Sequence, residues 1–188
     1  MGTIKTTNIE PIADNGTVTL GSSGDTFTLG SGVKQSNLMN PAFHATLSSN
    51  QSLSDNTATT VAFNSETFDT DNAYNNSTYR FIPQEAGKYF IYSNVYIESG
   101  ANTNMNRTLT YVYKNSTTAL FNYFDPRDNP GRAFTCNASG IIELNGSTDY
   151  VEVKVQIIAQ SSGSGLYVAG GTGGDAAFTY FGAYRIGS

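Results

Sequence analysis

The sequence has one cysteine, one histidine and no tryptophan in its 188 residues. Because Cys136 is alone, no disulfide can form within the chain and no cysteine-based metal site can be built. His44 is the single possible base for a Ser-His-Asp triad or a Cys-His pair. It lies within an expected strand, where a histidine more often faces solvent, and a lone cysteine is more often a small buried apolar residue. We therefore expect the chain not to be an enzyme.

Charged residues are scarce as well, at 13% of the chain, and the formal net charge is −5. The basic residues are scattered singly, and the acidic balance argues against nucleic acid or an anionic membrane as a partner. Glu143 and Glu152 form a pair of carboxylates within expected strands, and both are expected to face solvent. Glycoside hydrolysis needs two carboxylates that oppose each other in a cleft. A carbohydrate-active enzyme is therefore the least favoured of three hypotheses for the function.

Long apolar runs and sorting signals are missing too. No apolar run approaches the length of a membrane span, and the opening Met-Gly-Thr-Ile-Lys-Thr lacks the apolar region of a secretory signal. Gly2 followed by Thr6 fits the loose pattern for N-myristoylation, which such common residues also meet by chance. A chain without a signal or disulfides is expected to be made in a reducing cytoplasm. Assembly into a virus particle is one route by which it would leave the cell.

The residues that are abundant favour β-strands. Ser, Thr and Asn compete with helical hydrogen bonds, and each Gly in a helix costs roughly 1 kcal/mol. The large apolar surface comes from 12 Tyr and 11 Phe, residue types that fit a pleated, half-buried surface. No segment has a helical period. Composition and pattern together predict an all-β protein.

The first 37 residues form a segment of their own. Thr17-Val-Thr-Leu-Gly-Ser is followed by Thr26-Phe-Thr-Leu-Gly-Ser, a short tandem repeat in which two apolar residues alternate with threonine. One copy cannot bury its apolar face alone, whereas copies from neighbouring chains stacked around an axis can. A flexible Gly/Ser-rich linker is the alternative. We expect residues 1–37 to be a β-rich attachment stem and residues 38–188 to be a separate head domain.

The head contains about eight to ten short strands with turn signals between them, a spacing typical of a β-sandwich or jelly roll. The segment from Lys88 to Glu98 is the most informative, because Tyr89, Ile91, Val95 and Ile97 share one face while Phe90, Tyr92 and Tyr96 share the other. Apolar residues on both faces indicate a strand that is covered on both sides. The last strand, 177–186, also has aromatic residues on both faces, with Phe181 opposite Phe178, Tyr180 and Tyr184.

From Pro41 onward the sequence resembles the globular heads of the complement q-subunit and tumour necrosis factor superfamily. The resemblance lies in Pro41-Ala-Phe-His-Ala45, Tyr79-Arg-Phe-Ile-Pro83, Ala86-Gly-Lys-Tyr-Phe90, Asp149-Tyr-Val-Glu-Val153 and Phe178-Thr-Tyr-Phe-Gly182. It covers about 145 residues and implies a jelly roll of about ten strands that assembles as a homotrimer. A threefold assembly would bury the second apolar face, and we place four residues at that interface: Phe90, Tyr92, Tyr96 and Phe181.

The N-terminal segment resembles the start of fibre and appendage proteins of tailed bacteriophages, which attach by the N-terminus and present a trimeric C-terminal knob. The residues concerned are Thr3-Ile-Lys-Thr-Thr-Asn-Ile9 and the two repeats. We therefore expect a structural protein of a phage virion, a trimeric tail fibre or capsid decoration displayed on the particle exterior. Its partners would be other virion proteins and a protein or glycan of the host surface. A bacterial surface adhesin or ligand of the same trimeric fold is the alternative.

Binding residues concentrate on loops held by a rigid scaffold. The candidate loops are 102–106, 123–132 and 161–175, and the candidate receptor contacts, aromatic residues and arginines that suit protein or glycan recognition, are Tyr123, Phe124, Arg127 and Arg132. No cofactor is expected. Asp125 and Asp128 are weak candidates for Ca²⁺ ligands, because Asp is equally common in turns for its own hydrogen bonding.

Overall fold

The computed structural model describes residues 39–100, 104–160, 165–171 and 178–187, together with 19, 21–26 and 31. The chain separates into two units, Met1–Ser36 and Asn37–Ser188. The second unit, called the head below, holds all the described strands. Most of the tandem repeat lies outside the described residues, so the expected stem stays a prediction. No helix in the described part of the chain is long and apolar enough to cross a membrane.

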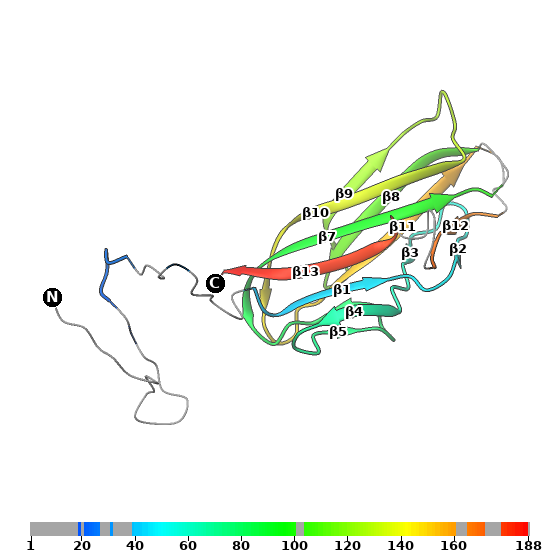
Figure 1. The fold of residues 1–188 in the computed structure, drawn as a ribbon. Coiled ribbons are helices and arrows are strands. Elements are labelled where there is room, and N and C mark those ends of the chain that lie inside the picture. Colours follow the sequence, from blue (N-terminus) through cyan, green and yellow to red (C-terminus); the bar gives the residue numbers. More distant parts are fainter. Residues whose placement is uncertain are drawn as a thin grey trace. The chain divides into compact units, whose positions relative to one another are not determined.

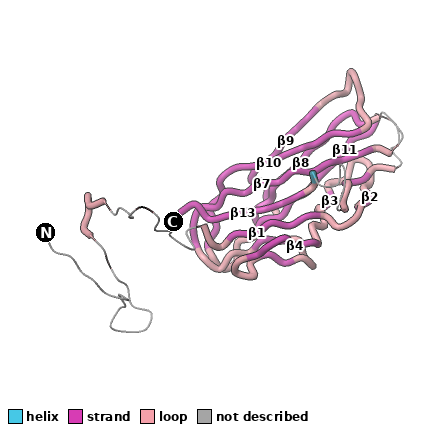
Figure 2. Tube along the Cα trace, viewed as in Figure 1, coloured by secondary structure: helices cyan, strands magenta, loops and turns pink. Residues whose placement is uncertain are grey.

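The head is a sandwich of two antiparallel sheets, which confirms the all-β prediction (Figure 1). In the first, the β7 sheet, the order is β2-β12-β7-β13-β1-β4, and β10 also pairs with β7. In the second, the β8 sheet, the order is β5-β6-β11-β8-β9, and β3 also pairs with β11. The strands are β1 (Ala42–Thr46), β2 (Gln51–Ser52), β3 (Thr59–Thr60), β4 (Ser65–Asp69), β5 (Tyr74–Asn75), β6 (Arg80–Phe81), β7 (Ala86–Glu98), β8 (Met105–Lys114), β9 (Thr117–Phe124), β10 (Ala133–Asn145), β11 (Val151–Ala159), β12 (Tyr167–Val168) and β13 (Tyr180–Gly187). Figure 2 shows that strands and loops make up nearly all of the head.

Strand β7 lies in the middle of its sheet and organises the fold. It pairs with β10 over the full length of both strands, and on its other side with β13 and then β12. Its inward side chains, Tyr89, Ile91, Val95 and Ile97, are completely buried, as the alternation in the sequence predicts. The side chains between them point away from the sandwich and are only half-buried. Only one face of this central strand is therefore covered within a single head.

Aromatic rings fill the core between the sheets. The Phe43 ring of β1 stacks between Tyr74 and Phe81, with centroid distances of 4.5 and 4.6 Å. Phe181 of β13 meets Phe43 edge-on at 4.9 Å. The buried hydroxyl of Tyr74 donates to the carbonyl oxygen of Phe63 at 2.7 Å, so its polar end is satisfied, and burial raises its pKa above the ordinary value. Such ring pairs add packing energy beyond the area that they bury.

The direction of the strands sorts the connections of the head into two ends. Strand β1 begins, and β13 finishes, at one end, where Ala42 pairs with Tyr184. Strands β7, β9 and β11 finish, and β8, β10 and β12 begin, at the opposite end (Figure 1). The three loops that the sequence indicates for binding belong to this far end. Residues 101–103, 161–164 and 172–177 of these loops lie outside the described residues.

Candidate functional site

The outer side of the β7 sheet carries a group of aromatic rings, which we call the outer aromatic face. Within it Phe90 lies 5.5 Å from Tyr184 and 6.3 Å from Tyr92, and Tyr92 lies 6.2 Å from Tyr180, as centroid distances. Tyr96 contacts Phe178 at 6.4 Å at one end of the row. The full set is Phe90, Tyr92 and Tyr96 on β7, Tyr180 and Tyr184 on β13, His44 on β1, Phe68 on β4, and Phe178 just before β13.

A glycine allows these rings to lie close to the sheet. A Cβ atom on Gly182 would come within 2.3 Å of the ring and hydroxyl of Tyr92, and within 2.8 Å of the backbone oxygen of Phe43. The Tyr92 ring therefore lies directly across β13 at the one position where no side chain is in the way. The result is a low, broad apolar surface. Burial beneath neighbouring rings also raises the pKa of the Tyr92 hydroxyl.

His44 lies at the centre of the outer aromatic face. Its ring is 5.4 Å from Tyr180, 6.0 Å from Tyr92 and 6.2 Å from Phe68. Its Nδ1 shares a hydrogen bond of 3.1 Å with the hydroxyl of Tyr92. Burial among the rings lowers its pKa. A histidine held by a phenol rather than by a carboxylate lacks the orienting partner of a catalytic base, and His44 serves as part of an apolar surface.

The structure corrects the position of Phe181. Phe181 was expected at the trimer interface with Phe90, Tyr92 and Tyr96, and those three do lie on the outer face. Phe181 is 0% exposed and points inward, where it packs against Phe43, Phe63 and Tyr74. Side chains of a strand alternate between its two faces, so the outward position beside it belongs to Tyr180.

The four candidate receptor contacts share the far end of the head but not one site. Tyr123 and Arg127 bind the same carboxylate, that of Asp125: the tyrosine hydroxyl donates at 2.7 Å and Arg127 Nε at 2.8 Å. Hydrogen bonds from Arg127 are the main reason why the pKa of Asp125 lies well below its usual range. Phe124 instead packs edge-on against Phe134 at 5.0 Å.

Arg132 belongs to a third group, centred on a carboxylate that is mostly buried. Its guanidinium donates to Glu98 Oε1 at 2.6 Å, and the hydroxyl of Tyr167 donates to the other oxygen of Glu98. The arginine also offers its backbone oxygen to both the amide and the hydroxyl of Ser99. These bonds tie the start of β10 to the end of β7 and to β12, so Arg132 holds the far end together.

The carboxylate of Asp125, one of the two candidate calcium ligands, is already bound by arginine side chains of the same chain. Both carboxylate oxygens of Asp125 accept hydrogen bonds from Arg127, and Arg107 lies 3.6 Å away. A cation would have to displace a guanidinium to reach them. Asp128 is exposed in the adjoining turn. In the part of the head that the structure describes, no three His, Cys, Asp or Glu side chains gather as a metal site would require.

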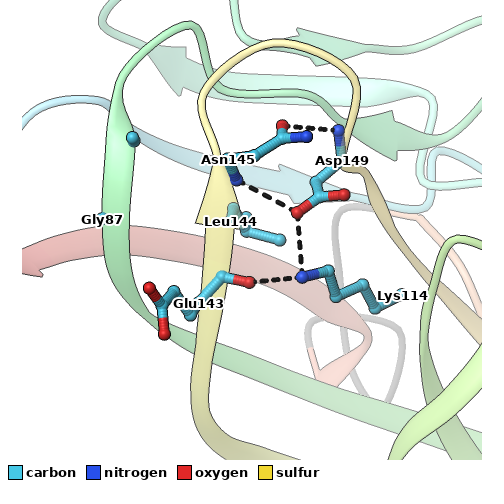
Figure 3. Close-up of a pocket in the computed structure, with 7 residues that line it drawn as sticks. Gly87, Lys114, Glu143, Leu144, Asn145 and Asp149 are labelled. Carbon is cyan, nitrogen blue, oxygen red and sulfur yellow. Dashed lines mark hydrogen bonds and ion pairs between the residues drawn. The ribbon is translucent and has the colours of Figure 1, made fainter.

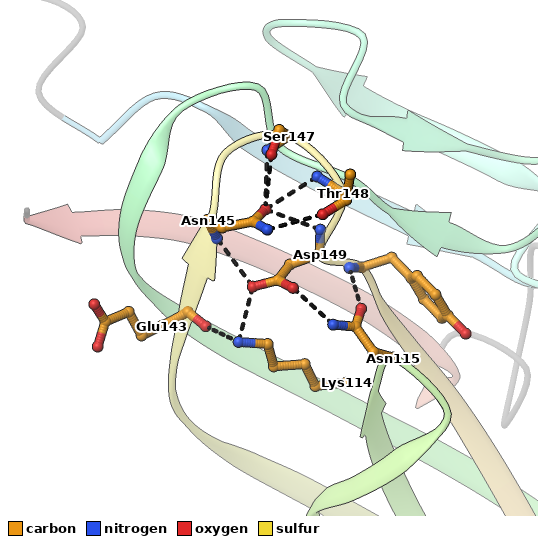
Figure 4. A network of polar contacts seen from close by, with 8 residues as sticks. Lys114, Asn115, Glu143, Asn145, Ser147, Thr148 and Asp149 are labelled. Atoms are coloured by element: carbon orange, nitrogen blue, oxygen red, sulfur yellow. Dashed lines mark hydrogen bonds and ion pairs between the residues drawn. The ribbon is translucent and has the colours of Figure 1, made fainter.

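An open depression of about 420 Å³ lies at the end of the head where β13 finishes (Figure 3). Its polar groups bind one another: Lys114 Nζ donates to Asp149 at 2.8 Å and to the carbonyl oxygen of Glu143 at 2.7 Å. The Asn145 side-chain oxygen accepts from the backbone amides of Ser147, Thr148 and Asp149 (Figure 4). This network holds the turn between β10 and β11, and its polar groups are engaged within the turn.

The thiol and the two strand carboxylates considered as catalytic groups do not come together in one site. Cys136 is buried as expected, with Thr108 Oγ1 at 3.0 Å from its sulfur, and burial raises the pKa of the thiol. Glu143 is exposed, as predicted, but the expectation for Glu152 is wrong: it is 3% exposed. Glu152 is paired with Arg80 at 3.0 Å and Lys154 at 3.5 Å, because β6 brings a cation against the outer side of β11.

A second group of rings, on the outer side of the β8 sheet, was not singled out from the sequence. Tyr111 and Tyr113 of β8 lie beside Phe121 of β9, which is among the most exposed apolar residues described. Tyr111 and Tyr113 occupy alternate positions of β8 on the side that faces solvent. This alternation of aromatic residues is the sequence signal that could have indicated the group.

No protein-family model and no curated protein matches the sequence. Solved structures do. Murine APRIL, in its crystal structure at pH 5.0, superposes with a TM-score of 0.54 at 16% identity, over 77% of this chain and 98% of that chain. The head shares the jelly-roll fold of this structure. The globular domain of zebrafish complement 1qA protein gives a TM-score of 0.51 at 14% identity, over 78% of this chain and 98% of that one. Likeness at this identity shows the fold, as the sequence resemblance predicted.

Proposed function

We propose that this chain is a non-enzymatic binding protein whose heads assemble as a homotrimer through the outer aromatic face. The single observation that carries the proposal is that face itself. Six of its members lie on the three adjacent strands β7, β13 and β1, and rings contact one another along its length. Contiguous apolar patches on soluble proteins mark interaction sites.

A second copy of the chain is the occupant that fits this face best. The rings interleave with few charged side chains, as in the core of an interface between subunits. The edge strand β10 of the same sheet extends this face with an apolar residue, Ile141, which lies opposite Phe90 and is 58% exposed. A contact between an edge of one copy and the face of the next is heterologous, and such contacts close into a ring when the rotation allows it. Covering β10 would also protect an open sheet edge.

We further propose that the protein is displayed on the exterior of a bacteriophage particle and contributes to attachment to the host. The support is the N-terminal segment, which resembles phage fibre and appendage proteins in residues 3–9 and in its two repeats. Heads that share a threefold axis would present their far-end loops, three copies each, on one side of the assembly. Attachment to a tail or to a capsid is equally compatible with this arrangement. A bacterial surface adhesin of the same trimeric fold is the alternative.

Light scattering of the full chain tests the assembly. The expected mass is three times the 20.1 kDa of one chain. Tyr92→Asp places a charge in the outer aromatic face and is expected to give monomers, whereas Phe121→Asp on the other sheet is the matched control and should remain trimeric. Monomeric wild-type protein, or a Tyr92→Asp variant that is folded and still trimeric, would refute the assembly.

Electron microscopy of particles labelled with an antibody against the head tests the display. Label on the exterior of phage particles is the expected result. Purified particles that carry no label, from cells that make the protein, would refute the virion assignment and favour the bacterial adhesin.

A further inference from the structure

The outer side of the β8 sheet presents a second aromatic surface, which we call the β8 strip: Tyr111, Tyr113, Phe121 and Tyr123. The strip lies away from the outer aromatic face, on the opposite sheet. Tyr111 stands opposite Phe121 in the strand pairing, and their rings are 6.5 Å apart and close to parallel. Tyr113 lies 5.6 Å from Tyr111 along β8. Phe121 and Tyr123 are 63% and 46% exposed, so flat ring faces are open to solvent.

Two of the three tyrosine hydroxyls of the strip donate hydrogen bonds, which hold the rings of Tyr111 and Tyr123 in place. Tyr111 donates to Gln156 Oε1 at 3.1 Å, and Tyr123 donates to Asp125 at 2.7 Å. Gln156 is itself held, because its Nε2 donates to the backbone and side-chain oxygens of Asn56. Rings that are held in place before a ligand arrives lose little freedom on binding. The strip is therefore a prepared platform of ring faces.

Cations surround the strip. Arg107 lies on the same side of β8 as Tyr111, with Leu109 between them, and Arg127 Nη2 donates to the hydroxyl of Tyr123 at 3.4 Å. Lys154 Nζ lies 4.9 Å from the centre of the Tyr113 ring, and Arg80 is the next cation along the sheet. Two carboxylates, Glu152 and Asp125, accompany these four cations. In these ion pairs the cations outnumber the carboxylates, on a chain whose net charge is −5.

Arg107 has unused binding capacity. Its Nε is shielded from solvent, and no atom among the described residues accepts a hydrogen bond from it. The nearest carboxylate, that of Asp125, is 3.6 Å away and already accepts hydrogen bonds from Arg127 and Tyr123. Arginine is suited to binding a carboxylate through two parallel hydrogen bonds. Because this Nε is shielded, an anionic ligand lying over the neighbouring rings would meet the solvent-exposed part of the Arg107 side chain, which is 35% exposed.

We propose that the β8 strip binds an acidic saccharide, a chain of pyranose rings that carry carboxylates, with sugar rings stacked on Phe121 and Tyr111 and a carboxylate at Arg107. A pyranose ring has a flat face of C–H groups that packs on an aromatic ring, and a uronic acid adds the negative charge that the surrounding cations favour. The strip offers ring faces on a sheet, whereas protein partners are usually anchored by side chains that fill pockets. This inference builds on the proposed attachment function and gives its receptor a chemical class.

Calorimetric titration of the full chain with trigalacturonate tests the proposal, and its methyl ester is the matched neutral probe. We expect the acid to bind, and the ester to bind at least tenfold more weakly because it lacks the charge for Arg107. Phe121→Ala should weaken binding of the acid about tenfold by removing a stacking surface, and Arg107→Gln should do so at least tenfold. Met39→Ala, which removes an exposed apolar side chain next to the start of β1 and belongs to neither aromatic surface, should leave binding unchanged.

Three outcomes would overturn the proposal. They are no binding of trigalacturonate, equal binding of acid and ester, and binding that neither Phe121→Ala nor Arg107→Gln weakens. A trisaccharide is short enough to occupy one strip at a time, so its measured affinity does not depend on whether the heads form a trimer. A trimer that fails to bind refutes this inference alone, whereas a monomer that binds refutes the proposed assembly alone.

Discussion

Two adjacent residues of β13 allow the inner and outer faces of the β7 sheet to be tested against each other. Phe181 is completely buried among three rings, while Tyr180 lies on the outer aromatic face against His44 and Tyr92. Phe181→Ala should leave a cavity and lower the free energy of unfolding by about 3–5 kcal/mol. For a domain of roughly 150 residues this corresponds to a fall in Tm of about 6–20 °C. Tyr180→Ala should cost the single head far less.

Dilution separates the two effects. If Tyr180 is at an interface, Tyr180→Ala weakens association, and its effect on stability depends on protein concentration. The Phe181→Ala loss should be the same at every concentration, because it arises within one head. Urea unfolding followed by near-ultraviolet circular dichroism, repeated over a hundredfold range of concentration, measures both. The reasoning fails if Tyr180→Ala destabilises as much as Phe181→Ala at all concentrations.

Three further predictions concern single positions. Because burial lowers the pKa of His44 below the ordinary 6.5, its neutral form is favoured in the folded protein. The free energy of unfolding should therefore be highest above pH 6.5 and fall as the pH drops from about 7 towards 5. His44→Gln should flatten this slope, measured by urea titrations at each pH. Gly182→Ala should force the Tyr92 ring off the sheet, which should cost about 1–3 kcal/mol in urea unfolding and reduce the fraction of trimer seen by light scattering. In Gly146→Ala the new Cβ would come within 2.2 Å of the backbone nitrogen of Ala86 at a φ of +70°, so Tm should fall by several degrees, and an unchanged Tm would contradict the described turn.

Much of the fold follows from local pattern, since alternation along one strand reports which side chains share a face. This was sufficient for β7, where the buried set Tyr89, Ile91, Val95 and Ile97 matches the prediction. It was not sufficient for β10, whose first half, from Ala133 to Ala138, mixes small, polar and aromatic residues. That half is a strand because it pairs residue by residue with β7, from Ala133 opposite Glu98 onward. Pairing partners are distant in sequence, so no local pattern contains them.

The candidate site shows the same limit. An aromatic residue with aromatic neighbours in sequence can point to either face, and Phe181 was assigned to the wrong one although its own alternation with Tyr180 and Tyr184 was visible. The environment of Glu152 depends on Arg80, which is 72 positions away along the chain. Likewise Tyr123, Phe124 and Arg132 are close in sequence, but each contacts a different partner. Tyr123 binds the carboxylate of Asp125, Phe124 packs on the ring of Phe134 of β10, and Arg132 binds the carboxylate of Glu98 of β7. Only the folded arrangement separates them.

The pairing of the first and last strands allows the connectivity of the head to be changed. Ala42 lies opposite Tyr184, and the amide of Arg185 donates to the backbone oxygen of Pro41, so the sites where this domain starts and finishes are neighbours. A short peptide could join them, and the chain could be opened instead between Phe124 and Ala133. Such a circular permutant would keep every pairing of both sheets, and fusion partners would then emerge from the side that normally carries the long loops.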